Sequence, residues 1–274
     1  MSLSETRHRA GRILRFLRQE TKIRRLFKKY VGFEGNFEDP KTHWEKVQYR
    51  KLYGNHAFYG RLADKVLVRD TVRERVGGDV LVPLLGVYDR LDEATLDSLP
   101  ESFVLKVSNA SGWNEVVRDK GKMDRKKAIR YFNRKLRRKF SRNCGEVHYD
   151  YSKSRVLAEA LLLEDGDLPW DLNFYCYHGS KGFDYCTHAT SADRSLEGHF
   201  HRDGTMLAGN LSKEMTVRRL SAANFGKMVE IARELSRGID FVRVDLYDVG
   251  GKIFFGELTF TSSAGFKVYH NSTL

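Results

Sequence analysis

The spacing of apolar residues predicts that the first part of the chain is helical. In residues 11–30 apolar side chains recur every three or four positions, and arginines and lysines fill the other side. This is the pattern of a basic amphipathic helix, whose apolar stripe consists of Ile13, Phe16, Leu17, Ile23, Phe27 and Tyr30. Residues 41–76 predict two further helices, the second of which ends at Gly77-Gly78.

The remainder of the chain mixes strands with helices. Short runs of β-branched and aromatic residues, bounded by turn residues, predict strands. They fall within "LVPLLGVYD" and at 102–107, 114–119, 172–179, 182–190, 241–249 and 252–260, with a strand or buried connector at 155–163. A brief helix in "DEATLDSLP", a basic helix at 125–142 and a helix at 223–237 lie between them. This order has no repeated βαβ rhythm and predicts an α/β (α+β) body.

Two carboxylates interrupt the last two apolar strands. Asp245 lies in "FVRVDLYDV" and Glu257 in "KIFFGELTF", and the Gly250-Gly251 turn between the strands predicts an antiparallel hairpin. Centring the hairpin on this turn puts Asp245 opposite position 256, beside Glu257. Because like charges this close repel, a Mg²⁺ ion between them is the simplest explanation. The alternative is that Arg243 and a nearby lysine neutralise them.

Lys106 is the next candidate, because it stands alone in the apolar strand "FVLKV". The small-residue loop 108–112 follows it directly. Backbone N–H groups of such a loop can approach phosphates, and a lysine at its edge adds a positive charge. The spacing is not that of a P-loop, and a plain hairpin loop is the alternative.

Composition and charge narrow the classes of protein. The chain has 274 residues, 41% of them hydrophobic, and a net charge of +12. Residues 1–30 contribute +8 and residues 118–142 contribute +11, so the rest carries −7. The basic residues lie on amphipathic helices instead of an aromatic-studded sheet face, which makes a nucleic acid an unlikely partner.

No apolar run approaches the roughly 20 residues of a membrane helix, and charges recur through the first 30 residues. We therefore expect a cytoplasmic protein. Helix 11–30 either packs on the core or makes peripheral contact with an anionic membrane on its inner face.

Eight stretches in order resemble a known family. They are "EKVQYRKLYG", "ADKVLVRDTV", "LVPLLGVYD", "LPESFVLKVSNASGW", "EVHYDYSKSRVLAEALL", "DLNFYCYHG", "FVRVDLYDV" and "IFFGELTFTSSAGF". The chain is similar to the TupA-like (teichuronopeptide-biosynthesis-type) ATP-grasp proteins of bacterial cell-surface polysaccharide clusters. The resemblance implies an ATP-grasp fold, with two α/β lobes enclosing the nucleotide after an N-terminal helical segment. The expected domains are 1–40 (basic helix), 41–100 (helical, pre-ATP-grasp) and 101–274 (ATP-grasp, with a small lobe at about 101–160 and a large lobe at about 161–274).

The resemblance also implies ATP and Mg²⁺ as cofactors and a role for each site residue. Asp245, Glu257 and Thr259 would hold the metal. Lys106 would contact the α/β-phosphates, and Arg194 and Arg243 would be further catalytic cations. The remaining nucleotide-binding positions would be Ser108, Asn109, Ser111 and Gly112 in the closing loop, Glu159, Ala160 and Leu161 in the hinge, and Asp171 and Asn173.

Two positions depart from the family pattern. Asn173 stands where the family usually has Lys or Arg, and Ala110 stands where it more often has His. One phosphate-facing cation is therefore missing from the expected set, which leaves a degenerate nucleotide-binding scaffold protein as an alternative.

The function implied by the resemblance is that of an ATP-dependent carboxylate–amine ligase acting through an acyl-phosphate. Its acceptor would be an acidic polysaccharide or a sugar acid, and its donor an amine or amino acid. An ATP-grasp phosphotransferase is the second enzyme alternative, because one fold hosts several chemistries.

Overall fold

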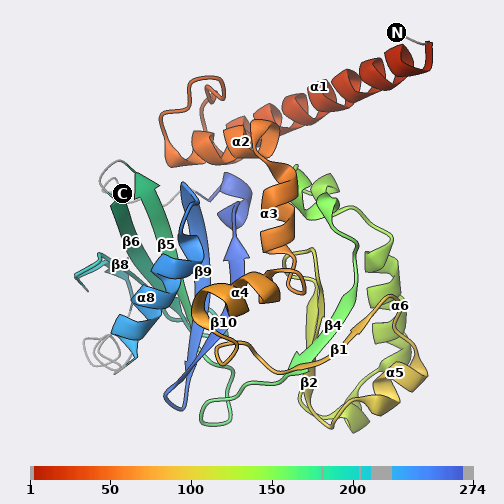
Figure 1. Ribbon diagram of the computed structural model, residues 1–274, viewed down its shortest axis with the longest axis vertical. Coiled ribbons are helices and arrows are strands. Elements are labelled where there is room, and N and C mark those ends of the chain that lie inside the picture. The colour runs from red at the N-terminus through yellow and green to blue at the C-terminus, as the bar shows by residue number, and fades with distance from the viewer. Residues whose placement is uncertain (1–2, 180–181, 204, 211–223, 268–274) are drawn as a thin grey trace. The chain divides into compact units, whose positions relative to one another are not determined.

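The computed structural model describes residues 3–179, 182–203, 205–210 and 224–267 (Figure 1). Contacts divide the chain into two compact units. Unit 1 consists of residues 1–60, 139–151 and 261–274, and unit 2 of residues 61–138 and 152–260.

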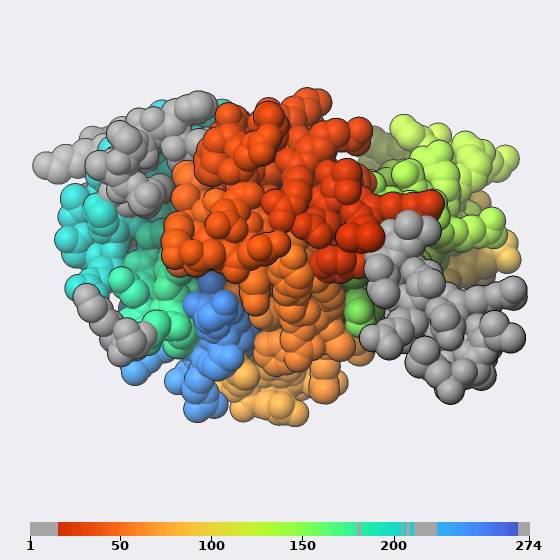
Figure 2. Space-filling model, turned by 90° about the horizontal axis from the view of Figure 1, so that it is seen from above, coloured from red at the N-terminus to blue at the C-terminus, as the bar shows by residue number. Residues whose placement is uncertain are grey.

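Unit 1 is built mainly from helices. It contains α1 (Leu3–Val31), α2 (His43–Tyr53), most of α3 (His56–Ala63), and the short helices η2 (Phe140–Arg142), η3 (Val147–Tyr151) and η4 (Ser262–Gly265). Its core includes Ile23 and Phe27 of α1, with Phe37, Leu52, Ala264 and Phe266. The surface of α2 and of α1 from residue 16 onward is drawn red to orange in Figure 2. Helix α2 begins where the Thr42 side chain accepts from the Glu45 amide and the Glu45 side chain accepts in return, which satisfies amides that a helix start leaves open.

The predicted N-terminal helix lies within α1, but its apolar stripe is only partly covered. Ile23 and Phe27 are fully buried, whereas Leu17 is 51% and Tyr30 is 53% exposed. Within the described residues, no helix combines the length and apolar content that crossing a membrane requires.

Unit 2 holds two antiparallel sheets. The smaller has the order β1-β4-β2-β3, formed by β1 (Leu84–Tyr88), β4 (Val156–Ala160), β2 (Phe103–Val107) and β3 (Asn114–Val117). The larger has the order β10-β9-β5-β6-β7-β8, formed by β10 (Lys252–Thr259), β9 (Phe241–Val249), β5 (Asp171–Gly179), β6 (Gly182–Thr190), β7 (Glu197–Phe200) and β8 (Met206–Gly209). Its described residues also form the helices α4 (Val68–Val76), α5 (Glu93–Ser98), α6 (Arg125–Leu136) and α8 (Phe225–Ser236), the short helix η1 (Lys120–Lys122) and the end of α3.

The two faces of the larger sheet differ in polarity. Val242, Val244 and Leu246 of β9 are fully buried on the face that α8 covers (Figure 1). Because side chains alternate along a strand, Arg243 and Asp245 lie on the other face. The polar site residues of the sheet therefore share one side.

The element pattern agrees with the sequence in most places and differs in several. The two helices expected in residues 41–76 are three, α2, α3 and α4, and the strands β7 and β8 were not expected. Of residues 155–163, left open between strand and connector, Val156–Ala160 form β4. The basic helix predicted over 125–142 ends at Leu136, and only the short η2 follows at Phe140–Arg142. Residue 223, expected to begin the helix that is observed as α8, lies outside the described residues. The domain boundaries near residues 40, 100 and 160 stay predictions.

Candidate functional site

The two strand carboxylates lie directly opposite each other. The hairpin keeps the expected register from Lys252↔Val249 to Phe255↔Leu246 and then shifts, so that Glu257 pairs with Asp245. Without this bulge at Gly256, Asp245 and Glu257 would point to opposite faces, since a one-residue slip reverses every side chain. The bulge therefore brings the two carboxylates to the same face.

Two cations neutralise this pair. Arg243 donates through Nε to Asp245 Oδ1 at 2.7 Å and through Nη2 to Oδ2. Lys65 Nζ lies 3.1 Å from Glu257 Oε2. Thr259 joins them, because its hydroxyl donates to Glu257 Oε1 at 2.9 Å and accepts from Arg243 Nη2 at 3.2 Å. The arrangement is the charge-paired alternative raised by the sequence, with Lys65 as the lysine.

The surroundings shift the two carboxyl pKa values in opposite directions. Burial raises the pKa of Asp245 to about 7, although the guanidinium of Arg243 acts against it. Burial also acts to raise the pKa of Glu257, but Lys65 and Arg243 outweigh it and lower that pKa to about 2. Of the two groups, Glu257 therefore holds its negative charge more firmly.

The donor atoms of this cluster fit a magnesium ion. Mg²⁺ prefers carboxylate and hydroxyl oxygens and usually completes its shell with water and phosphate oxygens. Asp245, Glu257 and Thr259 offer such oxygens side by side. A bound ion would share or displace the contacts of Arg243 and Lys65, which would then be placed to contact phosphate oxygens.

A second buried charge cluster lies in the smaller sheet. Lys106 Nζ on β2 donates to Glu159 Oε2 on β4 at 2.7 Å, and Arg69 Nη1 of α4 donates to Glu159 Oε1 at 3.1 Å. The side chains of Arg69 and Glu159 are each 8% exposed and that of Lys106 is 19% exposed. The structure thus joins the predicted phosphate lysine to the predicted hinge glutamate. The other hinge residues, Ala160 and Leu161, are half-buried.

The loop after Lys106 is anchored at its base and open at its tip. Ser108 is fully buried and donates to Asp64 Oδ2 at 3.0 Å, and Asn109 donates to the Ser152 carbonyl at 3.0 Å. Ser111 and Gly112 are exposed. The side chains of Ser108 and Asn109 therefore hold the loop, and its exposed tip is the part that can reach a ligand.

The remaining candidate residues, Asn173, Asp171 and Arg194, differ in how close they lie to the two carboxylates. Asn173 on β5 is buried directly opposite Asp245 on β9. Asp171 begins β5, and burial raises its pKa, with Arg243 and Arg194 acting in the lowering direction. Arg194 is exposed in a turn with φ +60°, so it is near enough to influence Asp171 without belonging to the paired cluster.

Comparison with protein families decides the assignment. The model of the family described as "TupA-like ATPgrasp" matches residues 45–274. The chain belongs to this ATP-grasp family. The family resemblance and the α+β ATP-grasp fold expected from the sequence are confirmed.

Several solved structures are similar to this chain. D-alanine–D-alanine ligase from Helicobacter pylori is 16% identical, over 72% of this chain and 54% of that one, with a TM-score of 0.45. N5-carboxyaminoimidazole ribonucleotide synthetase from Thermus thermophilus is 14% identical, over 80% and 51%, with a TM-score of 0.41. Phosphoribosylamine–glycine ligase from Thermotoga maritima is 12% identical, over 75% and 49%, with a TM-score of 0.42.

This ATP-grasp chain thus spans about half the length of each of these three structures. No curated protein matches its sequence.

Sequence reasoning missed two cations of this ATP-grasp chain. Lys65 contacts Glu257 and also donates to the Ala110 carbonyl at 2.8 Å, and Arg69 contacts Glu159. Both lie in "ADKVLVRDTV", one of the eight matching stretches, four residues apart. The sequence predicts one helix over both, and a spacing of four would place them on one face of it, a signal that could have marked them as partners of buried carboxylates. In the structure Lys65 lies in the turn between α3 and α4, and Arg69 lies in the first turn of α4.

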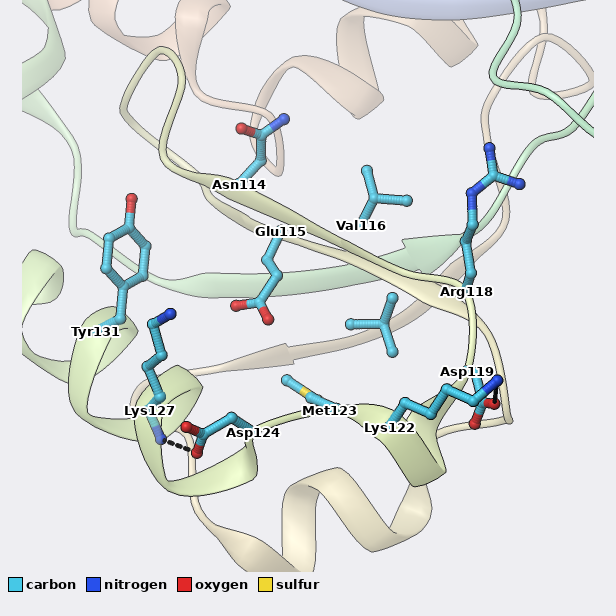
Figure 3. Close-up of a pocket in the computed structure, with 11 residues that line it drawn as sticks. Asn114, Glu115, Val116, Arg118, Asp119, Lys122, Met123, Asp124, Lys127 and Tyr131 are labelled. Atoms are coloured by element: carbon cyan, nitrogen blue, oxygen red, sulfur yellow. Dashed lines mark hydrogen bonds and ion pairs between the residues drawn. The ribbon is translucent and has the colours of Figure 1, made fainter.

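A separate hollow of about 680 Å³ lies beside the edge strand β3 (Figure 3). Glu115 points into it from β3, and Lys127 and Tyr131 of α6 lie across from it (Figure 3). Burial raises the pKa of Glu115. None of the candidate ATP-site residues lines this hollow, so it is distinct from the clusters around Asp245 and Lys106.

Proposed function

We propose that this chain binds Mg·ATP and acts as a carboxylate–amine ligase. The observation that carries the proposal is the pair Asp245 and Glu257, opposite each other beside Arg243 and Lys65, in a member of the ATP-grasp family. This arrangement suits a metal ion bound to phosphates. The carboxylates would neutralise the metal ion, and the cations would neutralise the phosphates.

The proposed roles follow from position. Asp245, Glu257 and Thr259 would hold Mg²⁺, which supplies charge neutralisation to the phosphates when bound. Lys106 would leave Glu159 and contact the α/β-phosphates. Arg69 would remain paired with Glu159 and neutralise it. The exposed tip at Ser111 and Gly112 would close over the phosphates, and the hinge 159–161 would meet adenine and ribose.

The cations beside the carboxylates would act in the chemical step. A carboxylate oxygen of the acceptor attacks the γ-phosphorus, the bond to the β–γ bridging oxygen breaks, and ADP leaves. Arg243 would stabilise the charge that develops on the transferred group, with Arg194 as a further catalytic cation. Asp171 and Asn173 would contact the nucleotide. The donor amine then attacks the acyl carbon, phosphate leaves, and the amine loses a proton to give an amide.

The substrate class is part of the proposal. We propose a sugar acid or acidic polysaccharide of the bacterial envelope as acceptor and an amine or amino acid as donor. The basic segment 118–142 supports an anionic acceptor, because it carries +11. The proposed site of action is cytoplasmic, with α1 in peripheral contact with the inner face of the membrane.

One observation favours a second candidate, a nucleotide-binding scaffold without turnover. The carboxylates already have cationic partners, and the uncharged Asn173 lies opposite Asp245. In that case ATP binds but no acyl-phosphate forms.

A melting-temperature titration with Mg·ATP tests the binding step. The wild type should be stabilised by about 2.7 kcal/mol at one hundred times the dissociation constant, and Glu257→Gln should lose most of this shift. Glu230→Gln is the matched control, because Glu230 is an exposed carboxylate on α8 (67%). No shift in the wild type, or an equal loss in both variants, contradicts the proposal.

Hydroxylamine trapping distinguishes the ligase from the scaffold, and both from a phosphotransferase. With Mg·ATP and a panel of sugar acids, a ligase gives an acyl-hydroxamate and ADP. A phosphotransferase gives ADP and a phosphorylated acceptor without hydroxamate. ATP binding with no ADP release across the panel supports the scaffold.

A further inference from the structure

Three side chains with metal-binding atoms meet on β6 and β7. His188 on β6 pairs directly with His199 on β7, and Glu197 lies two residues before His199 on the same strand. Residues two apart on a strand, and residues directly opposite each other, share a face of a sheet. All three side chains therefore project from the same side.

The distances suit a common ion. One ligand atom from each residue lies within 4.8 Å of the other two. His188 Nε2 is 3.5 Å from Glu197 Oε2, and the two imidazole rings are stacked 4.2 Å apart with an interplanar angle of 11°. Ligand atoms around a tetrahedral ion with bonds of about 2.1 Å lie about 3.4 Å apart. To reach that spacing the two stacked rings would tilt toward each other, so that both nitrogen lone pairs point at one ion.

The donor types indicate which ion would bind. Two imidazoles and one carboxylate are a ligand set of Zn²⁺ and of Fe²⁺, whereas Mg²⁺ takes oxygen ligands. Three protein ligands also leave a coordination position open for water or an oxygen of another molecule. The Glu197 side chain is 45% exposed, and the segment 182–203 reaches the surface (Figure 2), so an ion can enter from solvent.

This cluster is distinct from the candidate ATP site but shares its sheet face. The register runs from Asp245 on β9 to Asn173 on β5 and on to His188 on β6. With about 4.8 Å between neighbouring strands, the backbones at Asp245 and His188 lie about 10 Å apart. The two groups also face different partners, because Asp245 is held by Arg243 whereas His188 lies against Glu197 and His199.

We propose that His188, Glu197 and His199 bind one transition-metal ion of the Zn²⁺ class, separate from the magnesium of the ATP site. The ion clamps β7 onto β6 and offers its open position to a carboxylate or phosphate oxygen on the polar face of the sheet. The two sites select different metals by their donor atoms. The site at His188, Glu197 and His199 offers imidazole nitrogens, and the ATP site offers oxygens.

The test uses the full chain without a histidine tag, stripped of metal with EDTA and dialysed. Isothermal titration with ZnCl₂ should give one equivalent bound, and CoCl₂ should give visible d–d absorption of a low-symmetry site. His199→Ala and Glu197→Gln should each weaken zinc binding at least about tenfold, the scale of losing support at a metal site. Both residues are only partly buried, and circular dichroism verifies their folding.

Two control variants locate the ion. His201→Ala removes an exposed imidazole just after β7, and Glu257→Gln removes a carboxylate of the ATP site. Both should bind zinc like the wild type. Absence of stoichiometric binding overturns the proposal and leaves a histidine–glutamate charge pair. An equal loss of zinc affinity in His201→Ala would show nonspecific chelation by surface histidines. A loss of zinc affinity in Glu257→Gln would place the ion at Asp245. Either result also overturns the proposal.

Discussion

At Asp245 and Glu257, neighbouring residues decide how each carboxyl group titrates. Both are held among buried side chains, yet the pKa of Glu257 is about 2 and that of Asp245 about 7. The difference comes from Lys65, which contacts Glu257, while Asp245 is paired with Arg243. A lysine from outside the hairpin thus sets which carboxylate stays charged.

Acid should weaken the protein through Glu257. Its pKa in the folded protein lies below the ordinary value of 4.5, so its stabilisation is present above pH 4.5 and is lost as the pH falls toward about 2. The full effect is on the order of 3 kcal/mol. Urea unfolding in the presence of EDTA measures this. The difference in free energy of unfolding between the wild type and Glu257→Gln should shrink from pH 5 to pH 3. Parallel pH curves for the two proteins would contradict this.

The bulge in β10 shows how a single element aims the site. Gly256 is the extra residue, and a Cβ placed there would lie 3.1 Å from the Asp245 carbonyl oxygen and 3.1 Å from the Tyr247 ring. The backbone oxygen belongs to the paired strand and cannot move without disturbing the ladder. Glycine at this position therefore keeps the two carboxylates opposite each other.

Gly256→Ala should cost about 1–2 kcal/mol of stability and reduce the Mg·ATP shift in melting temperature. The control is Gly226→Ala on α8, where a Cβ meets nothing within 4 Å and alanine suits a helix better than glycine. That variant should be neutral or slightly stabilising and keep its ATP response. The prediction fails if Gly256→Ala keeps both stability and response.

Helix α8 should depend on a cap from α4. Arg75 Nη1 donates to the carbonyls of Glu234, Leu235 and Arg237 at 3.2, 2.9 and 3.0 Å. A cation at a helix C-terminus satisfies open carbonyls and opposes the helix dipole. Arg75→Ala should lower the free energy of unfolding by about 1–2 kcal/mol.

The matched control is Arg73→Ala on the same helix, whose exposed pair with Asp70 contributes at most about 0.5 kcal/mol. Urea unfolding of both variants, with hydrogen exchange at the end of α8, measures the difference. Equal losses in the two variants would rule out the cap.

Across the whole molecule, charge is separated along the sequence. The segments 1–30 and 118–142 hold the positive excess and the rest is negative. Lys126 and Arg130 are exposed on α6, while the carboxylates of the candidate ATP site are mostly covered. Attraction of an anionic acceptor and binding of ATP are therefore separable properties.

Lys126→Glu with Arg130→Glu should weaken binding to an acidic polysaccharide and leave the Mg·ATP shift unchanged. Binding of the wild type should fall steeply with added salt, because surface charges are screened. Lys227→Glu with Arg233→Glu on α8 changes the net charge equally and should bind like the wild type. Fluorescence anisotropy with a labelled polyuronate measures this, and equal weakening in both double variants would show that only net charge matters.

Local patterns in the sequence determined the elements and the candidate carboxylates. Apolar periodicity indicated α1 and α8, the Gly250-Gly251 turn predicted the β9–β10 hairpin, and two charges in apolar strands marked Asp245 and Glu257. These signals depend on residues near one another in the chain, where spacing fixes which side chains share a face. The family resemblance rested on the same short stretches.

Tertiary structure alone decided which groups meet across the sheets. The bulge at Gly256 changed the register that the turn predicts, and Lys65 and Arg69 reached carboxylates far along the chain. Ser108 and Asn109, expected at a ligand, are held by Asp64 and Ser152. The physical reason is that ion pairs and hydrogen bonds depend on distance in space. The spacing of residues along the chain does not give that distance before the strands have paired.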